Sequence, residues 1–182
     1  MTNDVNLGIG RASGMFYTAP AGTALPEYPT ATLGQDWVEA GAISQDGITF
    51  ATNQEFEPLK NWAQEIERLL PSENPGTVQA PIIDTTAASL AVLFEAENIV
   101  STAATAEHGA LTKVTIRPTN VNNARAFLFI GKDGDDTFML GTTNGFISNK
   151  DDITFAPTEA ITWNATISAT EWTFVKDNGQ TV

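Results

Sequence analysis

The chain has no cysteine among its 182 residues and a single histidine, His108. Without cysteine, structural disulfides and thiolate metal sites are excluded, and the composition fits folding in a reducing cytoplasm. A Ser–His–Asp triad also requires a nucleophile motif, and the sequence contains no nucleophile elbow. His108 stands beside Gly109 in a polar stretch, so we interpret it as a solvated loop residue. We expect no cofactor, no metal site and no enzymatic activity.

Basic residues are also scarce. Nine Lys and Arg stand against 22 Asp and Glu, which gives a formal net charge of −13 at pH 7. Because clustered Lys and Arg are what attract phosphate groups, a chain this acidic repels DNA instead of binding it through its overall field. Acidity that only keeps the protein soluble explains the same charge equally well.

Long apolar runs are missing. No run approaches the ~20 residues that span a bilayer, and the N-terminus lacks the basic and apolar regions of a signal peptide. The sequence therefore predicts neither a membrane partner nor secretion.

The abundance of Thr, Ile, Val and Phe favours strands over helices. We expect a mainly β protein: a two-sheet antiparallel β-sandwich of about eight to ten strands with one flanking helix. The helix is predicted from Thr85 to about Glu97, capped by Asp84 or Thr85. Its apolar positions follow helical spacing: Ala87, Leu90, Ala91 and Phe94. The main strands are predicted at residues 14–19, 37–44, 77–83, 111–117, 125–131, 137–140, 145–149, 161–167 and 172–175, with a hairpin turn at Lys132–Asp135.

We divide the chain into a flexible N-terminal arm, residues 1–13, and a single domain, residues 14–182. Residues 48–57 alternate as a strand does, and Pro58 interrupts the pattern. The segment from Trp62 to Leu70 fits either secondary structure. As a helix it places Trp62, Ile66, Leu69 and Leu70 on one face, and the residue pattern by itself favours the helix.

Acidic pairs are the remaining candidates for chemistry. Glu55 and Glu57, two residues apart, point to one face of a strand; they form either a solvated face or a negatively charged lining. Asp133–Asp136 and Asp151–Asp152 contain fragments of calcium loops without the full EF-hand pattern, so turn residues are the simpler interpretation.

The order of motifs in the first third of the chain is informative. It runs through four segments: Tyr17–Pro26 (YTAPAGTALP), Trp37–Ile48 (WVEAGAISQDGI), the acidic stretch Glu55–Glu57, and Leu59–Trp62 (LKNW). This set resembles the N-terminal half of the major tail tube proteins of long-tailed, siphovirus-like bacteriophages. Two departures stand out. Ala42 occupies a position where an aromatic residue is common, and Ala63–Glu65 replaces a Gly-rich turn.

The resemblance implies a fold and an assembly. It implies two packed antiparallel sheets with a flanking helix, and an extended arm or hairpin, residues 48–78, that reaches a neighbouring subunit. Hexameric rings would stack into a hollow tube in the virion tail, made in the host cytoplasm. DNA would pass through without specific binding, and the tape measure and terminator proteins would be partners. We expect inter-subunit contacts at Phe56, Trp62, Ile66 and Leu69, and lumen-lining acids at Glu55 and Glu57.

Two alternatives stay open from the sequence. One is another phage head–tail structural protein, such as a tail terminator or decoration protein. The other is a carbohydrate-binding module or hydrolase that uses acidic pairs and the four Trp residues.

Overall fold

The computed structural model describes residues 9–10, 16–52, 56–71, 75–117, 122–153 and 160–179. Strands dominate, and short helical segments interrupt them once. In chain order the elements are β1 Ile9–Gly10, β2 Phe16–Pro20, β3 Val38–Gly41, β4 Thr49–Ala51, β5 Phe56–Lys60, β6 Ile66–Pro71, β7 Gly76–Ile82, α1 Ala87–Phe94, the 3-10 turn η1 Ala96–Asn98, β8 Ile99–Thr102, β9 Leu111–Val114, β10 Arg125–Asp133, β11 Asp136–Lys150, β12 Trp163–Ala169 and β13 Thr173–Asp177.

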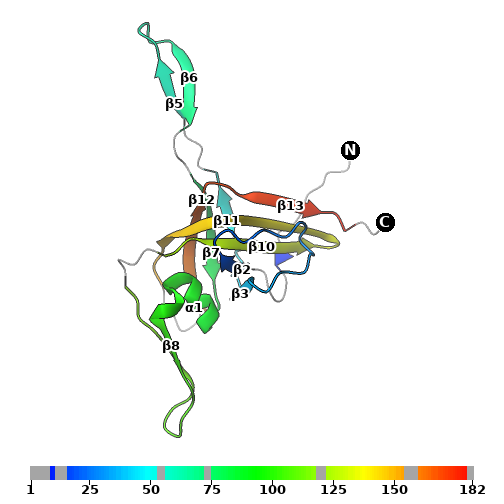
Figure 1. The fold of residues 1–182 in the computed structure, drawn as a ribbon, viewed down its shortest axis with the longest axis vertical. Coiled ribbons are helices and arrows are strands. Elements are labelled where there is room, and N and C mark those ends of the chain that lie inside the picture. Colours follow the sequence, from blue (N-terminus) through cyan, green and yellow to red (C-terminus); the bar gives the residue numbers. More distant parts are fainter. Residues whose placement is uncertain are drawn as a thin grey trace.

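Two antiparallel sheets share the long strand β11. Its first part pairs with β10 and β13, and β2 and β3 continue that sheet beyond β10. Its last part, Phe146–Lys150, pairs with β12, followed by β7 and β4. We call these the first sheet and the second sheet (Figure 1). The predicted mainly β, antiparallel sandwich with one helix is confirmed.

A second connection joins the sheets at the opposite side. After β3, Ile43 forms an isolated bridge with Ile82 of β7. The amide of Ser44 donates to the carbonyl of Pro81 at 2.8 Å. Because strands pass between the sheets at both sides, the two layers are held at a fixed distance around one core.

The core lies between the sheets and beneath α1. Strand alternation sends Phe127 and Phe129 of β10 inward, where Phe129 stacks on Phe16 with ring centroids 4.6 Å apart. Leu128 and Ile130 point to the other face of the first sheet, where residues of the 21–37 loop, such as Leu25 and Trp37, cover them. Strand β10 is therefore buried on both faces, which explains its continuous apolar run.

The predicted helix is present, with a different cap. Thr86 is the N-cap, and its hydroxyl accepts a hydrogen bond from the amide of Ser89 at 3.3 Å. Asp84 instead accepts from the amide of Thr86 at 3.1 Å, in a turn that precedes the helix. The α-helix ends after Phe94 because Glu95 adopts φ +62°, a conformation that breaks the helical path.

The segment from Trp62 to Leu70 is not a helix. Strands β5 and β6 pair as an antiparallel hairpin, with Glu57 opposite Leu70 and Leu59 opposite Arg68. The helix favoured by the residue pattern is wrong, and the hairpin implied by the family resemblance is confirmed. The outer parts of the predicted 48–78 arm belong to the second sheet, since β4 pairs with the first residues of β7.

Two hairpins leave the sandwich on opposite sides, toward the two ends of the molecule's longest axis (Figure 1). One is β5–β6. The other is β8–β9, in which Ile99 pairs with Val114 and Thr102 with Leu111; the polar stretch that contains His108 lies in its loop. Of the predicted N-terminal arm, Ile9–Gly10 pairs with Lys132 and Gly131 of β10, and the rest lies outside the described residues.

Candidate functional surfaces

The tip of the β5–β6 hairpin is organised by Asn61. Its side-chain oxygen accepts hydrogen bonds from the amides of Ala63 at 2.9 Å and Glu65 at 3.0 Å. The backbone closes the turn, since the Asn61 amide donates to the Glu65 carbonyl at 2.9 Å. Gln64 adopts φ +64° within this turn. These bonds satisfy amides of the turn locally, and Trp62 is one of the turn residues at the tip of the hairpin.

The hairpin presents apolar side chains to solvent. Trp62 is 101% exposed, Ile66 61% and Leu59 49%. Of the other two predicted contact residues, Phe56 begins β5 and Leu69 lies in β6, and their side chains lie outside the described ones. Among the described residues this hairpin pairs with no other strand, and an isolated two-stranded hairpin is marginally stable in water. Its exposed apolar side chains suit burial against a partner.

The outer face of the second sheet is polar and uncharged. Inward positions such as Val78, Ala80 and Ile167 are buried. The alternate positions carry hydroxyl, amide and a few apolar side chains, and no charged residue occurs among the outward positions described on these strands: Thr49, Ala51, Thr77, Gln79, Pro81, Phe146, Ser148, Asn149, Asn164, Thr166 and Ser168. Because the chain as a whole is strongly acidic, this uncharged face is unusual for its surface.

The second sheet also ends in two open edges. Within the described part of the chain, β4 pairs only with β7, and Phe146–Lys150 pairs only with β12. Each edge offers backbone N–H and C=O groups that form a template for another strand.

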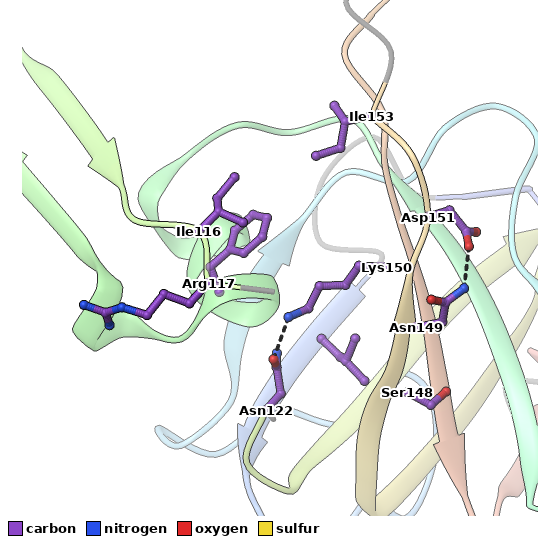
Figure 2. Close-up of a pocket in the computed structure, with 10 residues that line it drawn as sticks. Ile116, Arg117, Asn122, Ser148, Asn149, Lys150, Asp151 and Ile153 are labelled. Carbon is purple, nitrogen blue, oxygen red and sulfur yellow. Dashed lines mark hydrogen bonds between the residues drawn. The ribbon is translucent and has the colours of Figure 1, made fainter. Parts of the chain in front are cut away.

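Figure 2 shows a pocket of about 360 Å³ beside Lys150. It lies at the end of the second sheet opposite the β5–β6 hairpin, because Lys150 pairs with Ala165 whereas Gly76, where the chain returns from the hairpin, pairs with Ala169. Phe94 of α1 and Ile147 of β11 line it together with Ile116 and Ile153. Lys150 extends into it, and its ammonium donates to the amide oxygen of Asn122 at 2.7 Å. The same ammonium lies 5.4 Å from the centroid of the Phe94 ring, within cation–π range.

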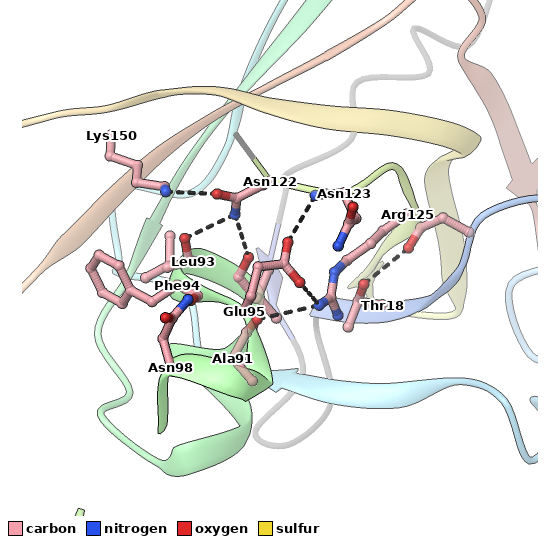
Figure 3. A network of polar contacts seen from close by, with 12 residues as sticks. Thr18, Ala91, Leu93, Phe94, Glu95, Asn98, Asn122, Asn123, Arg125 and Lys150 are labelled. Carbon is pink, nitrogen blue, oxygen red and sulfur yellow. Dashed lines mark hydrogen bonds and ion pairs between the residues drawn. The ribbon is translucent and has the colours of Figure 1, made fainter. Parts of the chain in front are cut away.

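Next to the pocket, side chains satisfy the last carbonyls of α1 (Figure 3). Asn122 donates to the carbonyls of Val92 at 3.1 Å and Leu93 at 2.8 Å. Asn98 donates to the carbonyl of Phe94 at 2.7 Å. The final turn of a helix leaves such acceptors unpaired. Asn98 pairs one of them locally, from the turn that follows α1, whereas Asn122 ties the helix end to the segment before β10.

Charges gather at the same helix end. Arg125 donates to the carboxylate of Glu95 at 2.6 Å, and the amide of Asn123 donates to the other carboxylate oxygen at 2.9 Å. Burial lowers the pKa of Lys150 below its ordinary value of 10.5, and the negative charge of Glu95 partly opposes that shift. The cations lie where the helix dipole is negative.

The sequence-predicted residues are spread over the molecule. Glu55 lies outside the described residues, and Glu57 is exposed on β5, away from the second sheet. The Lys132–Asp135 turn is confirmed between β10 and β11. His108 is exposed in the loop of the β8–β9 hairpin, where a ring nitrogen contacts the Gly109 carbonyl at 2.7 Å.

Sequence reasoning missed the Glu95–Arg125–Asn122 network because its members are up to 30 residues apart. The described residues hold no group of three or more His, Asp and Glu side chains placed to bind a metal ion. None of the described helices has the length and hydropathy needed to cross a membrane.

Comparison with known proteins gives one family. The family model described as phage tail tube protein matches residues 1–173 of the chain. No curated protein matches the chain.

Proposed function

The chain belongs to the phage tail tube proteins, and on that premise we propose that its copies form hexameric rings that stack into a hollow tube through which DNA passes into the host. Its role in the virion tail is structural. The observation that carries the proposed ring is the pair of open edges on the second sheet.

The directions of the four strands suit ring closure. The register shows that β4 and β12 run toward the end that carries the β5–β6 hairpin, whereas β7 and the last part of β11 run away from it. The two edge strands are therefore opposite in direction. The β4 edge of one copy meets the β11 edge of the next in antiparallel fashion, and repetition of this head-to-tail contact closes a ring.

In such a ring the uncharged outer face of the second sheet forms the channel wall. Hydroxyl and amide groups form hydrogen bonds with phosphates, but without Lys or Arg the wall lacks the counterion-release term that holds DNA to proteins. At one end of this wall, Asp46 and Asp151 line the same hollow as Thr49 and Gln79 and add negative charge. DNA then slides without specific binding. We also propose that Glu57 on the hairpin, together with Glu55, adds negative charge along the path of the DNA.

The proposed tube implies two further protein partners. A tape measure protein would occupy the lumen before DNA does, and a terminator protein would bind the last ring. Both would contact surfaces that a ring leaves open at its ends.

Electron microscopy of the purified protein tests the proposal. We expect six-fold rings or tubes. Thr49→Lys places a charge on the exposed β4 edge, where lysine blocks strand pairing, and should leave folded monomers without rings. Thr49→Ser keeps the edge neutral and should assemble like the parent. If the parent stays monomeric, or if Thr49→Lys closes rings of normal size, edge pairing is not how the ring forms.

A further inference from the structure

We propose that the pocket beside Lys150 is the receptor for the β5–β6 hairpin tip of a second copy in the adjacent ring, with Trp62 as the inserted side chain. This inference rests on the proposed stacking of rings and identifies the two surfaces that meet. Hereafter, the tip means residues 61–65, and the pocket means the hollow lined by Phe94, Ile116, Ile147, Lys150 and Ile153.

The positions of the two surfaces fit stacking. The hairpin leaves the second sheet between Ala51 of β4 and Gly76 of β7. In the register, Gly76 pairs with Ala169, and Phe146 with Ser168, at this end; Lys150 pairs with Ala165, nearer the opposite end. The tip and the pocket therefore lie at opposite ends of the same sheet. Copies related by a shift along the strand direction bring one copy's tip toward the next copy's pocket.

The shapes also correspond. The pocket has apolar walls from Phe94, Ile147 and Ile153, and its 360 Å³ lies near the lower end of the roughly 300–1,000 Å³ of ligand pockets, a size that suits one large side chain. Trp62 is fully exposed. An aromatic side chain buries about 150–250 Å² when it is enclosed, which makes it an effective anchor at an interface.

The charges are complementary. Lys150 extends into the pocket, whereas the guanidinium of Arg117 points away from it (Figure 2). That guanidinium donates to Asn98 at 2.7 Å. An ammonium has three N–H donors, and the hydrogen bond to Asn122 uses one of them. The tip carries one charged residue, Glu65, and the two strands carry Glu57 and Glu67 against Lys60 and Arg68, so the hairpin has a small excess of negative charge. The pocket lining also includes one acid, Asp151, whose carboxylate accepts a hydrogen bond from Asn149 at 2.6 Å and is turned away from the Lys150 ammonium (Figure 2). Lys150 is thus placed to pair with the Glu65 carboxylate of an inserted tip.

A second groove provides the contrast. It lies between the exposed face of α1, with Ala88 and Ala91, and the free edge residue Val38 of β3. Its charged lining includes Asp36, and its one Arg, Arg125, already pairs with Glu95. This groove therefore offers the Glu65 side chain of a tip no comparable cation.

Occupation of the Lys150 pocket also gives the tube a direction, since each ring presents tips at one end and pockets at the other.

Cross-linking tests the contact cleanly because the chain has no cysteine. Ala63→Cys marks the tip, and Ile116→Cys marks the pocket; both positions are exposed. Tubes of the double variant, treated with a short bismaleimide, should give a ladder of covalent multimers on a denaturing gel. Each single-cysteine variant serves as a control and should not form a ladder. Ala63→Cys combined with Ala88→Cys tests the second groove and should not form one either.

The outcomes separate the two proposals. Tubes with no 63–116 ladder, or with a 63–88 ladder in its place, overturn the receptor assignment and leave the tube intact. Absence of tubes from the parent protein overturns the proposed function itself. As a second measurement, Lys150→Met should raise the protein concentration needed for tube growth by about tenfold or more, because it removes the charge partner of the tip. Lys132→Met, at the β10–β11 turn, should not; equal effects of the two would also overturn the assignment.

Discussion

The carboxylate of Glu95 accepts a hydrogen bond from Nη2 of Arg125 at 2.6 Å, and this ion pair joins the residue after α1 to the first residue of β10. Only 10% of the Glu95 side chain and 23% of the Arg125 side chain are exposed. Glu95 also adopts φ +62°, which a non-glycine residue rarely does. The ion pair therefore holds in place a residue whose own backbone conformation is unfavourable.

Loss of Arg125 should destabilise the monomer strongly. Arg125→Met leaves the Glu95 carboxylate shielded from water, with the Asn123 amide still donating to it at 2.9 Å but no positive charge beside it among the described residues except the more distant Lys150. We expect a loss of about 3 kcal/mol in the free energy of unfolding, at the lower end of the range for a broken buried pair. Urea denaturation measures it. The double variant Glu95→Gln with Arg125→Met should recover part of the loss; if it is no more stable than the single variant, the buried charge is not the cause.

Asn122 should be more important to stability than its neighbour Asn123. Asn122→Ala removes the donor to the carbonyls of Val92 and Leu93, and each acceptor left unpaired costs about 1–3 kcal/mol. The side chain of Asn123 is exposed, so Asn123→Ala should change stability by less than about 0.5 kcal/mol. Thermal denaturation of the two variants compares them directly. Equal midpoints would show that Asn122 does not anchor the helix end.

Much of the sandwich could be predicted from local pattern. The apolar run at residues 125–131, the Lys132–Asp135 turn and the helix near Leu90 each carry their own signal: alternation, turn residues or helical spacing. The structure confirms all three. What local pattern could not supply is the sharing of β11 between two sheets, since that depends on pairings with residues far away in the sequence.

The hairpin shows why the rest could not be predicted from residues alone. From Trp62 to Leu70, apolar residues fit helical spacing, and the two whose side chains are described, Trp62 and Ile66, are exposed, so burial in the subunit does not decide between helix and strand. The deciding features are the Asn61 turn and the pairing of β6 with β5. The pocket could not be predicted from the sequence either, because Phe94, Ile116 and Lys150 come from separate segments of the chain.

The contribution of Lys150 to stability should depend on pH in one direction. Burial lowers its pKa in the folded state below 10.5, so in the window below 10.5 the unfolded chain binds more protons than the folded one. Stability from this group therefore rises as pH rises through the folded pKa toward 10.5. Lys150→Met should remove that rise, and Lys113→Met, on an exposed strand, should keep it. Urea denaturation at pH 8 and pH 10.5 gives the difference. If the stability of the parent and of both variants changes by the same amount over this interval, the assignment to Lys150 is wrong.

The channel wall can be tested by placing a single cation on it. Gln79 lies on β7 in the middle of the second sheet, and its side chain is exposed. Gln79→Lys should therefore leave the fold and ring closure intact while placing a ring of positive charges inside the tube. DNA should then adhere, and binding should weaken linearly with the logarithm of salt concentration, by a slope of about 0.9 for each phosphate neutralised. Gln79→Glu is the control of equal size and should pass DNA as the parent does.

Glu57→Gln is the companion variant on the hairpin. It should assemble more readily, and it should slow ejection only if the hairpin acids also face the channel. DNA-ejection rates of phages with each tail subunit distinguish the two surfaces. If Glu57→Gln slows ejection and Gln79→Lys does not, the wall is formed by the hairpin, and the uncharged sheet face lies elsewhere in the tube.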